Sequence, residues 1–174
     1  MTLIRIGLFL KTGTDDVKIE MARIMGRMTL TNSSKEQIAR KCAKTLVQLL
    51  SKPKGRAPSL QALCNLSVLD DNATILVDSA VIPALTDILF ENMDDSELKE
   101  LATSIIANIV QHPGHWEYSS IDNKGHSMQS ETTVFRLLGL LAHVSPQCQV
   151  SVLRILYGIS SSPQASGVSS ITSF

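Results

Sequence analysis

The sequence is poor in aromatic side chains, in net charge and in long apolar runs. Of its 174 residues, 44% are hydrophobic, but only 4% are Phe, Trp or Tyr. The core must therefore be built mainly from aliphatic side chains, which suffice for helices packed on helices. Sixteen basic residues balance sixteen acidic ones. This zero net charge argues against binding nucleic acid or an anionic membrane through long-range electrostatic attraction.

Cysteine is also scarce. Cys42, Cys64 and Cys148 form an odd set without a Cys-x-x-Cys pair, and each falls within an apolar helical pattern. We therefore expect buried, reduced thiols and a reducing compartment. The apolar stretch from Leu3 to Leu10 is interrupted by Arg5 and is too short to span a bilayer. We expect no signal peptide there.

What the sequence does contain is a repeat. Apolar residues at positions i, i+3, i+6 and i+7 recur in four segments, which begin at Leu3, Ala43, Ile82 and Val134. The starts are 40, 39 and 52 residues apart. This spacing places the apolar residues on one side of a helix.

A second ladder runs beside the first. Each apolar segment is followed by a longer helical pattern, and these longer patterns carry Gly26, Asn65, Asn108 and Gly158 at one equivalent position. Two ladders with nearly the same period indicate a structural repeat of about 40 residues. No segment shows strict alternation of apolar and polar residues, so we predict no strands.

Helix-breaking and capping residues agree with this pattern. Ser96 is the expected N-cap of the third long helix, and Pro146 is expected at the first position of the last one. A short additional helix is predicted before the apolar segment at 34–40 and again at 72–79, the latter capped by Asp71 or Asn72.

Three helices in about 40 residues are typical of the armadillo repeat, whereas HEAT repeats have two. We therefore predict an all-α, right-handed armadillo superhelix of about four repeats, incomplete at its ends. Its predicted parts are a partial repeat at 1–29, repeats at 30–70 and 71–111, a degenerate repeat at 112–160 with an insertion at 112–130, and a disordered Ser-rich tail at 161–174.

The sequence also carries a family resemblance. Asn65-Leu66-Ser67, then Asp71-Asn72, then the run from Ser79 to Leu85 resemble the boundary between two armadillo repeats, with Ala80 where glycine is usual at a tight corner. Further stretches resemble the armadillo region of plant U-box ubiquitin ligases, and they are 30–36, 69–78, 113–117 and 154–159. The likeness covers about residues 12–165 and is greatest to the senescence- and immunity-associated subgroup with long armadillo tails.

In that family an upstream U-box recruits a ubiquitin-charged conjugating enzyme, and the armadillo tail selects the protein to be ubiquitinated. The resemblance implies that this chain binds a protein partner or ubiquitination substrate in a concave groove. Because it holds no U-box, we expect no enzymatic activity and no cofactor. The expected location is the cytoplasm, with peripheral association at the plasma membrane as an alternative. A stand-alone armadillo scaffold or adaptor, without a link to ubiquitination, remains an open alternative.

The position of Asn65 and Asn108 faces the groove in armadillo repeats. An asparagine there offers a donor and an acceptor to the backbone of an extended peptide. The alternative is an asparagine that holds its own helix or a neighbouring loop in place. The groove hypothesis comprises Gln61, Asn65, Ser104, Asn108 and Arg154. Nuclear-import armadillos carry Trp one turn earlier, where this chain has Ala22, Gln61, Ser104 and Arg154, so import-cargo binding is not expected.

The segment 112–130 departs most from the repeat. Trp116 and Tyr118 lie in it, and they either cover an otherwise open core or contact a partner. His112 and His115 have no evident further ligands, so we predict no metal site. No local pairing predicts a catalytic residue.

The two ends of the repeat pattern are apolar. Solenoids normally end in polar capping faces, whereas Met1–Leu10 is apolar and no further repeat follows the last long helix. We therefore expect marginal stability or self-association.

Overall fold

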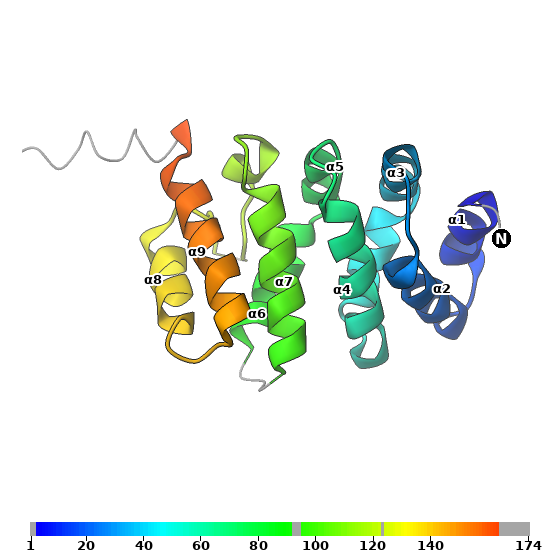
Figure 1. Ribbon diagram of the computed structural model, residues 1–174, viewed down its shortest axis with the longest axis horizontal. Helices are drawn as coiled ribbons and strands as arrows, with labels where there is room; N and C mark the ends of the chain where they lie inside the picture. Colours follow the sequence, from blue (N-terminus) through cyan, green and yellow to red (C-terminus); the bar gives the residue numbers. More distant parts are fainter. Residues whose placement is uncertain (1–2, 92–94, 123, 164–174) are drawn as a thin grey trace, which may run out of the picture. The chain divides into compact units, whose positions relative to one another are not determined.

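The computed structural model describes residues 3–91, 95–122 and 124–163, and within these ranges the chain is helical. The described part holds nine α-helices and one short 3-10 helix, with an isolated antiparallel bridge between Ser120 and Ser127 as its β-type pairing. This confirms the predicted all-α class. Figure 1 shows the order of the helices along the chain.

The chain divides into two compact units, Met1–Ala84 and Leu85–Phe174. The first contains α1 (Leu3–Thr12), α2 (Asp15–Arg27), α3 (Asn32–Leu49), α4 (Pro53–Ser67) and α5 (Asn72–Asp78). The helix α6 (Val81–Phe90) begins in it and ends in the second unit. The second also contains α7 (Ser96–Ile109), the 3-10 helix η1 (His115–Tyr118), α8 (Glu131–Leu140) and α9 (Pro146–Ser160).

The first unit is held together by α4. The helix α2 lies alongside α4, and α3 packs against α1, α4 and α5 (Figure 1). Aliphatic side chains fill the space between these helices, as the composition predicts, and the fully buried ones include Ile6, Leu10, Met25, Leu46, Leu60, Leu63 and Leu66. Burying one such side chain contributes about 1.5–3 kcal/mol, so this aliphatic core stabilises the unit.

The prediction of a separate short helix at 34–40 is wrong. The helix α3 continues without a break from Asn32 to Leu49. Its sequence contains neither Gly nor Pro after Thr31, whose hydroxyl caps the helix by accepting from the backbone N–H of Ser34. Without a residue that ends the helix, the i to i−4 hydrogen bonds continue through the predicted corner.

The second predicted short helix exists. Between α5 and α6 the chain turns at Ala80, whose φ of 62° lies in the left-handed region. That conformation costs a non-glycine residue about 1–2 kcal/mol. The tight corner predicted at this residue is therefore present, with alanine in a conformation that glycine would adopt freely.

No single helix in the described ranges is long and apolar enough to span a membrane; α5 and α6 reach the required length and hydropathy only together, across a bend of 76°.

In the second unit, α9 packs against both α7 and α8 (Figure 1). The predicted start of α9 is confirmed, because Pro146 takes the first helical position and the hydroxyl of Ser145 accepts from the N–H of Cys148. The predicted N-cap of α7 is wrong by one residue. Asp95 caps the helix through the N–H of Leu98, since a carboxylate satisfies this donor and complements the helix dipole.

The predicted boundary of the tail is also corrected in part. Ser162 is buried, and its hydroxyl donates to Glu117 on η1, which ties the end of α9 to the insertion. When a hydroxyl and a carboxylate are both buried, each needs a hydrogen-bond partner, and here they serve each other. The remainder of the predicted tail, 164–174, lies outside the described residues.

Candidate partner-binding surface

The ladder position predicted from the sequence falls on the four long helices α2, α4, α7 and α9, and both glycines on it lie against a neighbouring helix. A Cβ on Gly26 would lie 2.7 Å from Cβ of Gln61 and 3.2 Å from the backbone nitrogen of Ala62 on α4. A Cβ on Gly158 would lie 2.8 Å from Cγ2 of Val110. The backbones of neighbouring helices therefore approach each other closely at both Gly26 and Gly158.

Asn65, on α4, links α4 to α2 through its side chain. Its Nδ2 donates to the carbonyl oxygens of Met25 at 3.0 Å and Met28 at 2.9 Å. These carbonyls lie at the C-terminal end of α2, where the last carbonyls of a helix lack regular i to i−4 partners, and the Met25 oxygen also accepts a long 3.4 Å hydrogen bond from the N–H of Met28.

The observed geometry corrects the prediction that Asn65 offers both a donor and an acceptor to a peptide. A primary amide has two N–H donors, and both of those of Asn65 are directed at α2. The hydrogen bonds fit the alternative interpretation, in which Asn65 holds a neighbouring segment in place. Only the amide oxygen of Asn65 can serve a ligand without breaking this contact.

Asn108 and Arg154 come together in the second unit. Nη2 of Arg154 on α9 donates to Oδ1 of Asn108 on α7 over 3.4 Å. Arg154 is exposed and Asn108 is half-buried, so the guanidinium can exchange this long hydrogen bond for one to a ligand.

The groove positions lie on narrow, partly exposed stripes. On α7, Ser104 and Asn108 are one turn apart and half-buried, while every residue between them is buried. On α4, Gln61 and Asn65 are also one turn apart and half-buried. The structure thus brings together Gln61 with Asn65 in the first unit, and Asn108 with Arg154 beside Ser104 in the second. That all five line a single groove stays a prediction.

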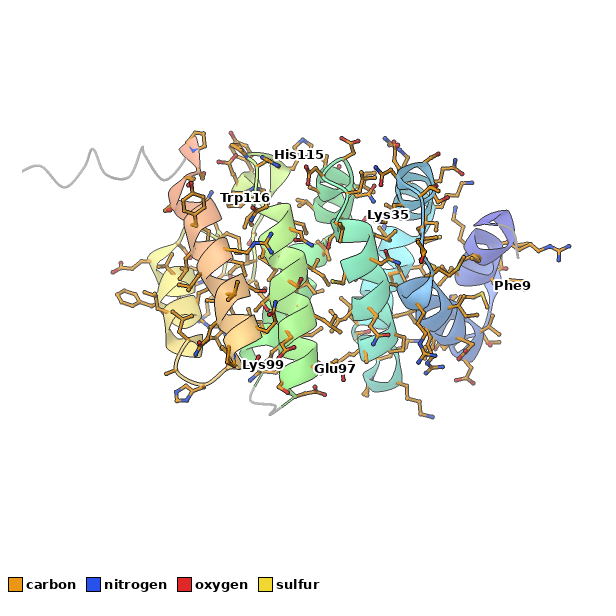
Figure 2. The ribbon with its side chains drawn as sticks, viewed as in Figure 1. Phe9, Lys35, Glu97, Lys99, His115 and Trp116 are labelled. Carbon is orange, nitrogen blue, oxygen red and sulfur yellow. The ribbon has the colours of Figure 1, made fainter. Side chains whose placement is uncertain are left out.

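The insertion folds around Trp116. This side chain is 2% exposed, and its Nε1 donates to the carbonyl oxygen of His112 at 2.8 Å. The short helix η1 is closed at its start by Glu117, whose Oε2 accepts from the N–H of Gly114 at 3.0 Å. Figure 2 shows Trp116 and His115 on this element.

Trp116 is therefore a core residue, and its predicted role as a partner contact is corrected. A side chain with so little exposed area leaves almost nothing for a partner to bury, whereas its indole fills the space beneath the insertion. Tyr118, two residues later, is 77% exposed. The contact hypothesis for this loop now concerns Tyr118 alone.

A cavity of about 350 Å³ lies between α6, the insertion and α8, and sequence reasoning missed it. Its lining residues are Thr86, Asp87, Phe90, Glu91, Ile121, Asp122 and Arg136. The guanidinium of Arg136 lies 3.8 Å above the ring of Phe90. No sequence signal marks the cavity, because its walls come from segments some 35 to 50 residues apart.

Asp122, on the wall of this cavity, makes three hydrogen bonds within its own loop. Its Oδ1 accepts from the backbone N–H groups of Lys124 and His126, and its Oδ2 lies 2.6 Å from Nδ1 of His126. The hydrogen bond from the His126 side chain holds the pKa of Asp122 below its ordinary value of 3.8. The arrangement is a turn closed by a carboxylate.

Two of the three cysteines lie between helices, Cys42 beside Gly7 of α1 and Cys148 beside Thr103 of α7. Cys42 and Cys148 are buried, and burial raises the pKa of both thiols above the ordinary value of 9.0. Cys148 also lies 3.4 Å from the hydroxyl of Thr103. Among the described residues, no group of three or more His, Cys, Asp or Glu side chains comes together as a metal ion would require.

Comparison with known proteins gives these helices a context. The chain is similar to a segment of plant U-box domain-containing proteins. It is 29% identical over 158 residues to U-box domain-containing protein 43 of Arabidopsis thaliana and 30% identical over 158 residues to protein 44 of the same plant. It is 25% identical over 162 residues to the putative U-box domain-containing protein 42. No family model matches.

The similarity covers most of this chain but little of each U-box relative. It includes 88%, 87% and 90% of the chain, yet the chain spans 20%, 19% and 16% of the length of proteins 43, 44 and 42. The match therefore corresponds to one region of much longer proteins.

Two crystal structures of engineered proteins share the fold. One has a TM-score of 0.73 and 22% identity, and the match covers 95% of this chain and 65% of that protein. The other has a TM-score of 0.70 and 21% identity, with 92% and 65% covered. At these identities the likeness concerns the fold alone, and it supports an α-solenoid.

Proposed function

We propose that this chain is an armadillo-repeat module that binds a protein partner and corresponds to the partner-recognition region of a U-box ubiquitin ligase. The observation that carries the proposal is the similarity to U-box proteins over nearly the whole chain, confined to about a fifth of their length. The packing of helix on helix within each unit supports it, since helical repeats of this kind present extended binding surfaces.

The binding surface in this proposal is the half-buried stripe on the long helices. Ser104 and Asn108 supply a hydroxyl and an amide one turn apart, and Arg154 supplies five N–H donors beside them. An extended peptide has free backbone N–H and C=O groups that match these side chains. The guanidinium of Arg154 further favours a partner segment with a carboxylate.

The chain itself is proposed to select and not to catalyse. In a reaction with ubiquitin, an activating enzyme and a conjugating enzyme, the isolated chain should form no ubiquitin chains. Added in excess to a full-length U-box relative, it should lower ubiquitination of a partner that both bind. We place this activity in the cytoplasm, with peripheral membrane association as the alternative.

The partner-binding proposal is tested by capture from plant extract on the immobilised 174-residue chain, followed by quantitative mass spectrometry. The variant Ser104→Tyr places a bulky ring on the stripe, and Thr132→Tyr makes a similar change at an exposed position of α8. Captured partners should fall at least about tenfold with Ser104→Tyr and stay unchanged with Thr132→Tyr, while both variants keep the helical circular dichroism of the parent. Equal capture by both variants would show that the stripe is not the binding surface.

A further test separates the ligase connection from a plain scaffold. If excess chain competes with a U-box relative for a captured partner and lowers its ubiquitination, the proposed link to ubiquitination is supported. If the captured proteins are bound by the chain but are never ubiquitinated by the relatives, the chain is a scaffold and that link is wrong.

A further inference from the structure

The helices α1 and α3 carry an excess of positive charge. They pack against each other (Figure 1), and together they hold six basic residues and a single acidic one, Glu36. The chain as a whole is neutral, so this excess is local. Exposed charges act over only about 8 Å at physiological ionic strength. A partner that reaches these two helices therefore meets a basic surface, whatever the net charge of the whole chain.

Three of these basic residues gather where α1 and α3 meet. Gly7 of α1 faces α3, because a Cβ on it would lie 3.8 Å from both Sγ of Cys42 and Cδ of Lys41. The aliphatic stem of Lys41 therefore lies against α1, although the residue is exposed. Lys11 follows Gly7 by one turn and so lies on the same side of α1. Lys44 lies one turn beyond Lys41 on α3.

The thiol between the two helices agrees with this arrangement. Burial raises the pKa of Cys42, and the ammonium groups of Lys11 and Lys41 oppose that rise. Both ammonium groups therefore lie close enough to the same sulfur to act on it electrostatically. We call Lys11, Lys41 and Lys44, which are all exposed, the basic seam. A further helix packed on the far side of α1 would leave the basic seam exposed.

Carboxylates of the same unit do not neutralise the basic seam. Among the described residues, none of its three ammonium groups lies within ion-pairing distance of a carboxylate. Three carboxylates of the unit are paired with other cations, namely Glu36 with Arg40, Glu20 with Arg23, and Asp15 with Lys52. Unpaired like charges repel one another, and an acidic ligand would relieve that repulsion.

On α3 the basic seam is part of a longer row of hydrogen-bond donors. Gln37, Lys41, Lys44 and Gln48 are exposed and spaced by four, three and four residues, so they lie in one line along the helix, here called the donor row. At 1.5 Å per residue the donor row is about 16 Å long, which is the length of about five residues of an extended chain. Its ammonium and amide groups all donate hydrogen bonds, and carboxylates are their natural acceptors.

We propose that the basic seam and the donor row bind an extended acidic segment of a partner protein, whose carboxylates contact Lys11, Lys41 and Lys44. Alternate side chains of an extended segment lie about 7 Å apart on one side, and flexible lysine stems can adjust to that spacing. This surface lies on other helices than the half-buried stripe of Ser104 and Asn108. It is thus a second binding surface, separate from the one in the proposed function.

A protein segment fits this surface better than other polyanions do. The three unpaired cations of the basic seam are fewer than the roughly four to eight clustered basic residues that hold a protein on an anionic lipid surface. The donor row contains no aromatic ring on which a nucleic-acid base could stack. Short side chains with carboxylates at alternate positions need neither feature.

The intact chain tests the proposal with an amidated hexapeptide of alternating Glu and Ser that carries an N-terminal fluorescein, measured by fluorescence anisotropy. Lys41→Gln together with Lys44→Gln removes two charges from the basic seam. Lys54→Gln together with Lys124→Gln removes two charges from exposed lysines elsewhere. Affinity should fall at least about fivefold with the first pair and stay within about twofold with the second. Added salt should weaken binding by the parent, and both variants should keep its helical circular dichroism because the substituted side chains are exposed.

The opposing results are distinct. If the parent does not bind the peptide at millimolar concentration, or if the two pairs weaken it equally, the proposal is wrong, since equal weakening reflects net charge alone. A single-stranded oligonucleotide or a phosphatidylserine vesicle that binds more tightly than the peptide, and only while Lys41 and Lys44 are present, would also overturn it. Ser104→Tyr should bind the peptide as the parent does, so failure of the stripe on α7 and failure of the basic seam can be told apart.

Discussion

Gly158 of α9 lies directly against the backbone carbonyl of Val110, the C-cap residue of α7. A Cβ added to Gly158 would lie 2.8 Å from Cγ2 and 3.2 Å from the carbonyl carbon of Val110, with the carbonyl oxygen closer still. A backbone atom cannot move aside as a flexible side chain can. The approach of these two helices therefore requires glycine at this position.

Gly158→Ala should consequently destabilise the chain, by about 1–3 kcal/mol as other overpacked sites do. Gly139 provides the matched control, since a Cβ there meets no atom within 4 Å. Gly139→Ala in an exposed helix should instead stabilise by about 0.5–1 kcal/mol. Urea unfolding of both variants measures the two effects. Equal changes would contradict the close approach at Gly158.

Asn65→Ala should destabilise the chain because it removes both hydrogen bonds that cap the end of α2. The carbonyls of Met25 and Met28 would lose their side-chain donor, at a cost of about 1–3 kcal/mol. The same change at the exposed Asn32, at the start of α3, should stay within about 0.5 kcal/mol. Thermal or urea unfolding distinguishes them, and an unchanged stability for Asn65→Ala would show that the amide is not a structural clamp.

Truncating Trp116 should lower the stability of the chain, whereas truncating Tyr118 should leave it almost unchanged. Trp116→Ala empties a buried site and should destabilise by about 3–5 kcal/mol. Tyr118→Ala removes an exposed ring and should change stability by less than about 0.5 kcal/mol. If the insertion contacts a partner, capture by the Tyr118 variant falls while its melting temperature holds. A stable Trp116→Ala variant would refute the role of the indole in the core.

The three thiols should differ in reactivity toward a thiol reagent such as Ellman's. Cys64 is half-buried, whereas Cys42 and Cys148 are buried with raised pKa values. A low thiolate fraction and poor access both slow the reaction. We expect one faster thiol in the folded chain and three equivalent ones in denaturant. Cys64→Ser should remove the faster phase; if it persists, the burial assignments are wrong.

Acid should weaken the turn that Asp122 closes. The hydrogen bond from His126 lowers the pKa of Asp122 in the folded chain, so the carboxylate's contribution is present above the unfolded pKa and is lost as pH falls through the folded one. The stability difference between the parent and Asp122→Asn should therefore be largest above about pH 4 and shrink below it. Salt should reduce the difference as well, because the pair is partly exposed. A difference independent of pH would contradict the assigned hydrogen bond.

Much of this molecule can be predicted from neighbouring residues. The all-α class and the start of α9 at Ser145 and Pro146 follow from local patterns of apolar spacing and backbone preference, whereas the corner at Ala80 was implied by the resemblance to an armadillo boundary. Helix periodicity and capping act over a few residues, so the sequence expresses them directly. The continuous α3 shows the limit of such predictions. The analogy with other repeats placed a helix boundary after Arg40, but no residue there breaks a helix, and α3 continues through it.

The roles of individual side chains were decided only by the tertiary structure. The donors of Asn65 are directed to carbonyls 40 and 37 residues away, and Trp116 is buried beneath a loop whose path the sequence pattern does not describe. The cavity beside Arg136 and the basic seam between α1 and α3 likewise depend on which helices become neighbours. A repeat pattern determines which residues share a side of a helix. The packing of one helix on another decides which of those sides are buried and which are left for a partner.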